Sequence, residues 1–577
     1  MNAILQYGFY LAVLVALAGP LGGYIAKVMD GKKVFLSRVL RPCENGLYKL
    51  MRINEAEDMD WKKYALCAVV FNVFGFLALW AMQLLQNVLP LNPEGMPAAS
   101  WHLGFNTASS FMTNTNWQSY SGEVTLSYFT QMLGLTVQNF VSAATGIAVL
   151  FALIRGLRRV KERGVGSFWT DMVRTVVYIL IPLSLALALV QTSQGVIQNF
   201  SGHVEYKLVE PLEITLESGQ TSEITGGYIP MGPASSQVAV KQLGTNGGGY
   251  NGLNSAHPLE NPTPLSNLGE MLALLLIPVA LCFTFGLAVR DQRQGRAIFL
   301  AMFILLAVAL GCCALAEHNG TPQLAQGGDV TSAANMEGKE TRFGIPASVT
   351  WAAFTTAASN GSVNSMHDSY TPLGGMIPLL LMQLGEVVFG GVGCGLYGMI
   401  GFVILAVFIA GLMVGHTPEY LGKKIEAREM KMAVLVCLAT PVACLIGAGI
   451  ACLVPSTAAS LNNAGAHGFS EVLHAYSSSA GGNNGSAFAG FNANTPFLNV
   501  SIGLVMLFAR FVPMLATLAI AGSMVQKKRI AVSAGTLSTS NGMFVFLLII
   551  VVLLIGALSF FPSLALGPIA EHFLMLG

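Results

Sequence analysis

Charged side chains are scarce in this sequence of 577 residues, because Asp, Glu, Lys and Arg together make up only 10% of it, against about 25% in a typical soluble domain. The 30 basic residues nearly balance the 29 acidic ones, so the chain lacks the positive field that nucleic-acid binding requires. In their place, 53% of the residues are hydrophobic. This composition excludes a soluble enzyme, a disordered chain and a nucleic-acid binder, and it indicates a protein embedded in a lipid bilayer.

Motifs of nucleotide chemistry are absent as well. The sequence contains neither a Gly-x4-Gly-Lys-[Ser/Thr] phosphate-binding loop nor an Asp-Lys-Thr-Gly phosphorylation string. Its nine Cys lie in or beside apolar runs or in a cytoplasmic loop, without a disulfide framework or zinc-ligand spacing. We therefore expect no bound cofactor and no hydrolysis of ATP by the chain itself.

Long apolar runs are present instead, and each is long enough for a helix that satisfies its own backbone in lipid. We place about ten transmembrane helices at residues 4–28, 64–87, 125–154, 168–192, 263–289, 297–316, 371–414, 431–455, 496–522 and 541–566. The run 371–414 is too long for one straight helix. We expect it to be broken at its glycine-rich stretch, Phe389–Gly398.

Basic residues are distributed unevenly over the connecting loops. Of the 30 Lys and Arg, 25 lie on or beside alternate loops, four lie in the other set, and Arg510 lies inside a span. Because basic loops stay on the cytoplasmic side of a membrane, this distribution predicts that both termini lie outside the cell.

Four polar strings recur after the second, fourth, sixth and eighth spans, each at the end of a moderately apolar segment too short to cross the membrane. When their Asn residues 114, 246, 360 and 484 are aligned, the first string has Thr115 where the others have Gly. A single Asn-Gly is an ordinary turn, but the fourfold recurrence favours a repeat. The strings consist of Thr113, Asn114, Thr115 and Asn116; Thr245, Asn246, Gly247 and Gly248; Ser359, Asn360, Gly361 and Ser362; and Asn483, Asn484, Gly485 and Ser486.

This pattern predicts an all-α polytopic membrane protein with four pseudo-repeats of helix, re-entrant pore loop and helix around one pore. Irregular backbone at membrane depth is tolerated only where it lines a cavity or is buried in protein. Four such loops can surround a monovalent cation with carbonyl oxygens. The expected parts are an extra N-terminal span at 1–28, repeats at 64–155, 168–290, 297–415 and 431–523, and an extra C-terminal span at 541–577.

Glu386 and Arg510 are charged residues inside apolar runs, each 15 residues after the Thr of a Thr-Pro dipeptide that opens a span. Ionisable residues within spans indicate a functional site, and the spacing places this pair below the strings. A purely structural ion pair is the alternative. His416 lies where a basic residue would be expected at the inner end of a span, and its role stays open.

Several strings resemble the potassium-transporting ATPase A subunit family, the channel-like part of the bacterial Kdp complex. The resemblance covers the whole chain and is carried by Thr113–Glu123, Gly244–Gly249, Ser255–Pro258, Gly385–Gly393 and Thr417–Lys424. It implies the pore architecture of the Trk/Ktr/HKT potassium transporters in a bacterial inner membrane. It further implies that the four strings select K⁺ and that Gly390–Gly398 obstructs the straight path, diverting the ion to a partner. By the same resemblance, Glu386 and Arg510 would line the inner vestibule or its exit.

The implied partners are a P-type ATPase B subunit that hydrolyses ATP and a single-span C subunit, and a small accessory peptide is left open. The transported ion would be K⁺. One alternative is a stand-alone K⁺ channel or secondary transporter of the same superfamily. Another is a membrane enzyme acting on a lipid or quinone, which the scattered His and the lack of a paired-carboxylate motif disfavour.

Overall fold

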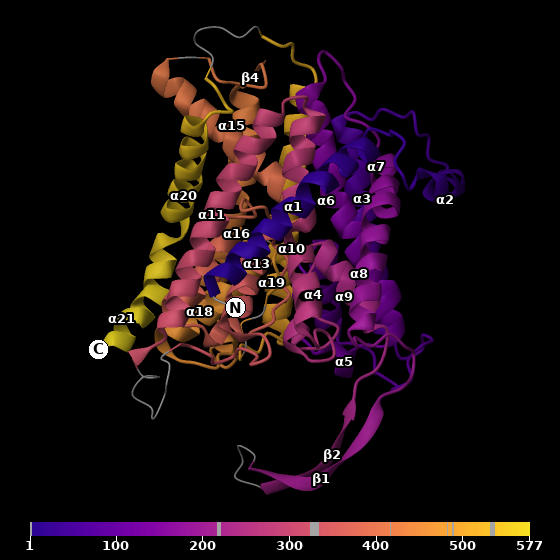
Figure 1. Cartoon of the computed structure of the whole chain (residues 1–577), viewed down its shortest axis with the longest axis vertical. Coiled ribbons are helices and arrows are strands. Elements are labelled where there is room, and N and C mark those ends of the chain that lie inside the picture. The colour runs from indigo at the N-terminus through magenta and orange to yellow at the C-terminus, as the bar shows by residue number, and fades with distance from the viewer. Residues whose placement is uncertain are drawn as a thin grey trace.

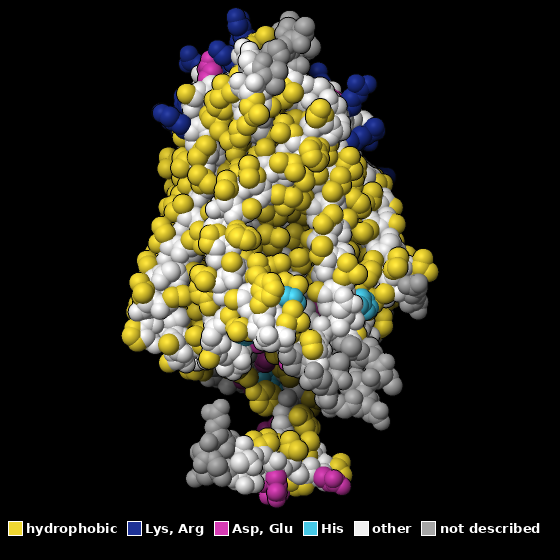
Figure 2. All heavy atoms as spheres, turned by 90° about the vertical axis from the view of Figure 1, so that its left-hand side faces the viewer, with side chains coloured by type: hydrophobic (Ala, Val, Ile, Leu, Met, Phe, Trp, Pro, Cys, Tyr) yellow, Lys and Arg dark blue, Asp and Glu magenta, His cyan; other side chains and the backbone are white. Residues whose placement is uncertain are grey.

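The computed structural model describes residues 3–215, 221–322, 334–415, 417–481, 483–486, 488, 490–530 and 537–577. His416 lies outside the described residues. The described chain is a bundle of long helices that run side by side (Figure 1). Figure 2 shows hydrophobic side chains along the flank of the bundle and Lys and Arg gathered at its upper end.

Ten helices among the described residues are long and apolar enough to cross a membrane, which confirms the number of spans expected from the sequence. They are α1 (Ala3–Met29), α3 (Trp61–Leu85), η1 with α6 (Thr130–Thr136 and Val137–Arg158), α7 with η2 and α8 (Phe168–Arg174, Thr175–Leu180 and Ile181–Ser193), α10 (Pro264–Ala288), α11 (Gln292–Asn319), α15 (Cys394–Val414), α16 (Ala427–Leu453), α19 (Pro496–Met524) and α20 with η6 and α21 (Gly542–Leu564, Ala565–Ile569 and Ala570–Leu576).

Shorter elements lie between the spans. Four half-length helices follow α3, α8, α11 and α16, as the repeats predict. They are α4 (Trp101–Met112), α9 (Ala234–Leu243), α13 (Gly344–Ala357) and α18 (Gly465–Tyr476), the last continued by a π-helical turn, η5 (Ser477–Gly481). The remaining helical pieces are α2 (Ser37–Met51), α5 (Gly122–Thr125), η3 (Asn254–Ala256), η4 (His367–Ser369), α14 (Pro372–Gln383) and α17 (Pro455–Ala458).

The long apolar run 371–414 is broken, as expected, but the break lies earlier than the glycine-rich stretch indicates. Helix α14 already ends at Gln383, and α15 begins at Cys394. Positive φ angles at Gly385 and Glu386 turn the backbone at the start of the break. The last residues of the predicted break therefore form the first turn of α15.

A β-hairpin projects from the otherwise helical bundle, and the sequence analysis did not anticipate it. Strands β1 (Val204–Thr215) and β2 (Thr221–Ile229) pair antiparallel and extend away from the spans (Figure 1). The segment is rich in β-branched and aromatic residues that favour extended backbone. A second, minimal pair joins β3 (Glu419–Tyr420) to β4 (Lys423–Lys424).

The spans differ in how much protein surrounds them. In the most apolar stretch of Thr130–Arg158, 83% of the residues are buried inside the protein, and in Pro264–Ala288 the share is 78%. In Trp61–Leu85 it is 22%. The third and fifth spans therefore form the centre of the bundle, and the second presents most of its apolar surface to its surroundings.

Candidate functional site

All four polar strings lie directly after the half-length helices and are buried at the centre of the protein. The string 113–116 follows α4, 245–248 follows α9, 359–362 follows α13 and 483–486 follows η5. Each half-helix thus points its C-terminal, partially negative end at a string. The structure brings together all sixteen residues that the sequence marks as candidates.

The strings contact one another in chain order. A Cβ added at Gly247 would overlap the carbonyl of Asn360, one at Gly361 would overlap that of Asn484, and one at Gly485 would overlap that of Thr115. The Asn116 side chain closes the circle, because its Nδ2 donates to the Gly247 carbonyl at 3.0 Å. Four loops from distant parts of the chain therefore form one closed ring, with the backbone of each string against the next.

Side-chain amides strengthen this ring. Asn114 Nδ2 donates to the carbonyl of Thr245 at 2.9 Å, and Asn484 Nδ2 donates to that of Thr355 at 2.7 Å. Asn483 Nδ2 lies 3.0 Å from Thr115 Oγ1. These neutral hydrogen bonds hold neighbouring repeats in place.

The first string is shifted by one residue from the alignment suggested by its Asn residues. Positive φ angles occur at Asn114 and Asn116, whereas the other strings have them at 245 and 247, 359 and 361, and 483 and 485. Asn116, not Thr115, therefore takes the place of the glycines. Asn tolerates the left-handed conformation better than most residues. An alignment that matches Asn with Asn and looks for Gly therefore places the first string one residue out of register.

The ring offers backbone carbonyl and hydroxyl oxygens without a carboxylate in any string. Such neutral oxygens can replace the hydration shell of a monovalent cation. A dedicated Ca²⁺ site would be expected to include carboxylates. The chemistry of the ring therefore suits a monovalent cation better than a divalent one.

Glu386 and Arg510 meet next to the fourth string. Arg510 Nη1 lies 3.8 Å from Glu386 Oε1 and donates to Cys394 Sγ at 2.6 Å. These three side chains and Asn483 line one cavity of about 20 Å³, enough for about one water-sized particle. The charged pair therefore adjoins a small space that also touches the ring.

Polar residues of the third span also support the ring, and the sequence analysis did not single them out. Asn139 Oδ1 accepts from Asn116 Nδ2 at 2.9 Å, and Ser142 Oγ donates to Asn114 Oδ1 at 2.8 Å. The available signal was the spacing of these two polar residues, three positions apart in a mainly apolar span, which places both on one face of the helix.

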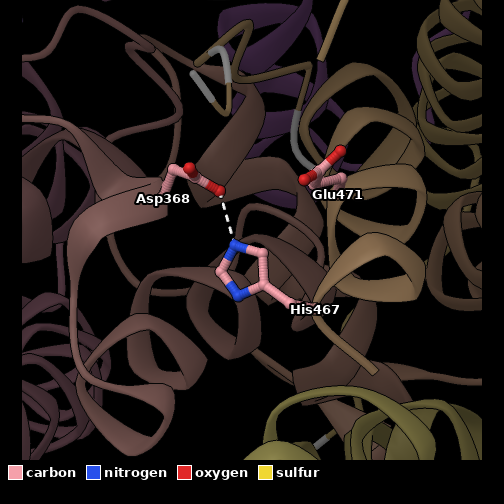
Figure 3. Close-up of side chains that lie close together, drawn as sticks. All are labelled: Asp368, His467 and Glu471. Atoms are coloured by element: carbon pink, nitrogen blue, oxygen red, sulfur yellow. Dashed lines mark hydrogen bonds and ion pairs between the residues drawn. The ribbon is translucent and has the colours of Figure 1, made fainter. Parts of the chain in front are cut away.

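Another polar cluster lies outside the ring, where Asp368, His467 and Glu471 approach one another (Figure 3). Their potential ligand atoms lie within 4.8 Å of one another, a spacing that could suit a metal ion. However, His467 Nε2 pairs with Asp368 at 2.7 Å and Nδ1 with Glu571 at 2.8 Å. The hydrogen bond to Asp368, followed by that to Glu571, raises the pKa of His467 to about 10. The imidazole is therefore a protonated link between two carboxylates.

The fold is that of an all-α polytopic membrane protein in which four buried loops meet in one ring. The structure of the potassium transporter TrkH from Vibrio parahaemolyticus matches with a TM-score of 0.50 at 13% identity, covering 86% of this chain and 97% of that one. At this identity the likeness concerns the fold alone. The family model of the potassium-transporting ATPase A subunit matches residues 8–573, and the chain belongs to that family.

Relatives from several bacteria match over the full length. A potassium-transporting ATPase potassium-binding subunit from Clostridium botulinum (strain Alaska E43 / Type E3) is 68% identical over 583 residues and covers all of both chains. Subunits of the same name from Clostridium perfringens and Desulfovibrio desulfuricans are 66% and 62% identical, each covering all of this chain and 100% and 99% of their own.

Proposed function

We propose that this chain is the potassium-binding and translocating subunit of an ATP-driven, high-affinity K⁺ uptake complex. The observation that carries the proposal is the closed ring of four buried strings, in which each backbone packs against the next. The names of the relatives, potassium-binding subunits of a potassium-transporting ATPase, support K⁺ as the ion. In this proposal, K⁺ enters from outside and is selected by carbonyl oxygens of the strings.

Below the ring, we propose that the ion reaches the cavity beside Glu386 and Arg510 and leaves toward a P-type ATPase subunit. The broken segment between α14 and α15 supports this route, because it inserts irregular backbone next to that cavity. The sequence lacks the nucleotide motifs that energy coupling needs, so a B subunit would hydrolyse ATP. A single-span C subunit completes the proposed complex, and a small accessory peptide is left open.

The proposed setting is a bacterial inner membrane with both termini outside, as the distribution of basic residues favours. No cofactor is proposed for the chain, and K⁺ is its transported ion. The division into four repeats between two extra spans stays a prediction, supported by the recurrence of half-helix and string.

Gly361→Ala tests the filter, because the new Cβ would overlap the carbonyl of Asn484 and force the ring open. We expect the apparent K⁺ affinity to fall by about tenfold or more, which corresponds to about 1.4 kcal/mol, with weaker discrimination against Rb⁺ and Na⁺. The measurement is ion uptake over a concentration series, in cells that lack other K⁺ importers and express the whole complex.

Gly195→Ala is the matched control. Gly195 has a φ of 104°, close to the 94° of Gly361, but a Cβ there would meet no atom within 4 Å. Both substitutions place a Cβ on backbone with a similar positive φ, so their conformational strain is similar. Only Gly361→Ala introduces an atom into the ring. Equal affinity and ion preference in the Gly361→Ala and unmutated complexes would contradict the filter assignment.

Expression of this chain without the other subunits separates the proposal from a stand-alone channel. The lone chain should give no ATP-dependent accumulation of K⁺. Concentrative uptake by the lone chain would instead favour a channel or secondary transporter.

A further inference from the structure

Each half-helix clamps the end of its string through a side chain. In the first, third and fourth repeats the clamp is a hydroxyl that donates to a backbone carbonyl five residues beyond the helix end, which in the fourth repeat is the end of η5. These bonds join Ser110 Oγ to the Trp117 carbonyl at 2.9 Å, Thr355 Oγ1 to that of Ser362 at 2.7 Å and Ser478 Oγ to that of Ser486 at 2.7 Å. The same three residues accept N–H groups from the middle of their strings through their own carbonyls. In the third repeat Trp351 Nε1 adds a second hydrogen bond, at 2.8 Å, to the same carbonyl, that of Ser362.

The second repeat has a lysine at this position. Lys241 Nζ donates to the carbonyl of Gly248 at 2.8 Å, and its own carbonyl accepts from the N–H groups of Asn246 and Gly247. The backbone pattern is thus the same as in the other repeats. Only the clamping group differs, a charged ammonium in place of a neutral hydroxyl.

This ammonium is buried and paired. The Lys241 side chain is 1% exposed, and its Nζ lies 2.5 Å from Oε2 of Glu260, whose side chain is 0% exposed. The other Glu260 oxygen accepts the backbone N–H of Asn251. Burying an ion pair costs desolvation energy, and the attraction between the two charges often does not repay it. A gain in folding stability therefore does not account for the placement of this pair against the ring.

The backbone of the second string also departs from that of the third and fourth. Gly247 and Gly248 have consecutive positive φ angles of 73° and 69°. Ser362 and Ser486, at the place of Gly248, are not among the residues with positive φ. The carbonyl held by the ammonium therefore belongs to a peptide turned differently from its counterparts.

We propose that Lys241 is a positioning residue that sets the ion preference of the filter by fixing the Gly248 peptide with a charge-assisted hydrogen bond. The inference rests on the proposed function of the ring. Hydrogen bonds from a charged donor are stronger than neutral ones, so at a similar distance the ammonium holds the second string more rigidly than a hydroxyl would. Glu260 neutralises the ammonium, so the fixed charge does not repel the K⁺ that passes the ring.

The test replaces the pair by the neutral clamp of the third repeat. In the Lys241→Thr/Glu260→Gln complex, the hydroxyl restores the group found at Thr355 without leaving a lone buried charge. We expect the ratio of apparent affinities for K⁺ and Rb⁺ to change by at least about threefold, measured by uptake in cells lacking other K⁺ importers. Glu260→Gln alone leaves the ammonium unbalanced, and it should weaken the affinity for both ions more than the double variant does.

A second buried pair supplies the control. Lys339 and Glu317 lie 2.6 Å apart with both side chains 0% exposed, and the Lys339 ammonium contacts the carbonyl of Glu337 and the ring of Tyr370 rather than a string. Lys339→Thr/Glu317→Gln removes the same charges. It should change the amount of complex in the membrane without changing the K⁺ to Rb⁺ ratio.

The outcomes separate this inference from the proposed function. An unchanged ratio in Lys241→Thr/Glu260→Gln, together with an altered ratio in Gly361→Ala, would overturn the role of Lys241 and leave the filter standing. An equal change of the K⁺ to Rb⁺ ratio in both double variants would also overturn the role of Lys241. If the double variant does not assemble, Lys241→Arg keeps the charge but changes the donor geometry, and an unchanged ratio there would count against the proposal.

Discussion

At the scale of single residues, Glu386 and Arg510 are a second pair of charges that adjoins the proposed ion path, beside the pair of Lys241 and Glu260. They share a cavity with Asn483 of the fourth string, but they also resemble a structural ion pair. Their separation of 3.8 Å is long for a hydrogen-bonded pair, and Arg510 makes its shorter contact with Cys394. The loose pairing leaves the carboxylate able to interact with a cation that enters the cavity.

Neutralising either member of this pair distinguishes a role in ion passage from a purely structural ion pair. Glu386→Gln leaves the positive Arg510 facing the cavity, so the apparent K⁺ affinity should fall by about tenfold, or about 1.4 kcal/mol. Arg510→Gln leaves the carboxylate, so the affinity should rise while maximal uptake falls because the ion leaves more slowly. Uptake curves of the assembled complexes give both quantities. Changes of the same sign in both variants, with a loss of protein, would indicate a structural pair only.

At the scale of elements, the half-helix α18 is tied to the C-terminal end of the chain by His467. Its ring pairs with Asp368, next to α14 (Figure 3), and with Glu571 of α21. The link joins three elements on the side of the bundle from which the hairpin projects. It holds the start of a half-helix whose other end leads into a string.

The strength of this link should depend on pH. Hydrogen bonds with Asp368 and Glu571 raise the pKa of His467 from its ordinary value of 6.5 to about 10. The stabilisation is therefore fully present below about pH 6.5 and is lost as the pH rises through about 10. Between pH 7 and 10, the melting temperature of the purified protein should fall by roughly 1–2 °C more than that of His467→Gln. The same dependence of melting temperature on pH in the two proteins would contradict the ion-pair assignment.

At the scale of the whole molecule, the basic residues and the hairpin lie at opposite ends (Figures 1 and 2). The 25-to-4 distribution of basic residues predicts that the hairpin end faces outside. Val209 on β1 is fully exposed, and the native Cys43 on α2 is exposed near the other end.

A cysteine at Val209 tests this orientation. Val209→Cys should react with a membrane-impermeant thiol reagent in intact cells whose outer barrier admits the reagent. Cys43 is the internal control, since it should react only after the membrane is made permeable. Labelling at Val209→Cys only after permeabilisation would reverse the predicted orientation.

The sequence by itself determined the features that depend on local chemistry. Ten apolar runs gave the spans because a helix in lipid must be long and apolar over its own length. The polar strings were found because Gly and Asn mark backbone that leaves the helix. The length of the run 371–414 predicts the break between α14 and α15. Its observed boundaries differ from the predicted ones because helix ends depend on tertiary contacts as well as on composition.

Only the tertiary structure decided how the strings meet. The one-residue shift of the first string follows from Asn116 taking the left-handed position beside Gly247, a contact between segments 131 residues apart. The cavity shared by Glu386, Arg510 and Asn483 likewise joins distant segments. Local pattern cannot specify such contacts, because a residue type fixes which conformations are allowed, whereas packing against a distant segment selects one of them.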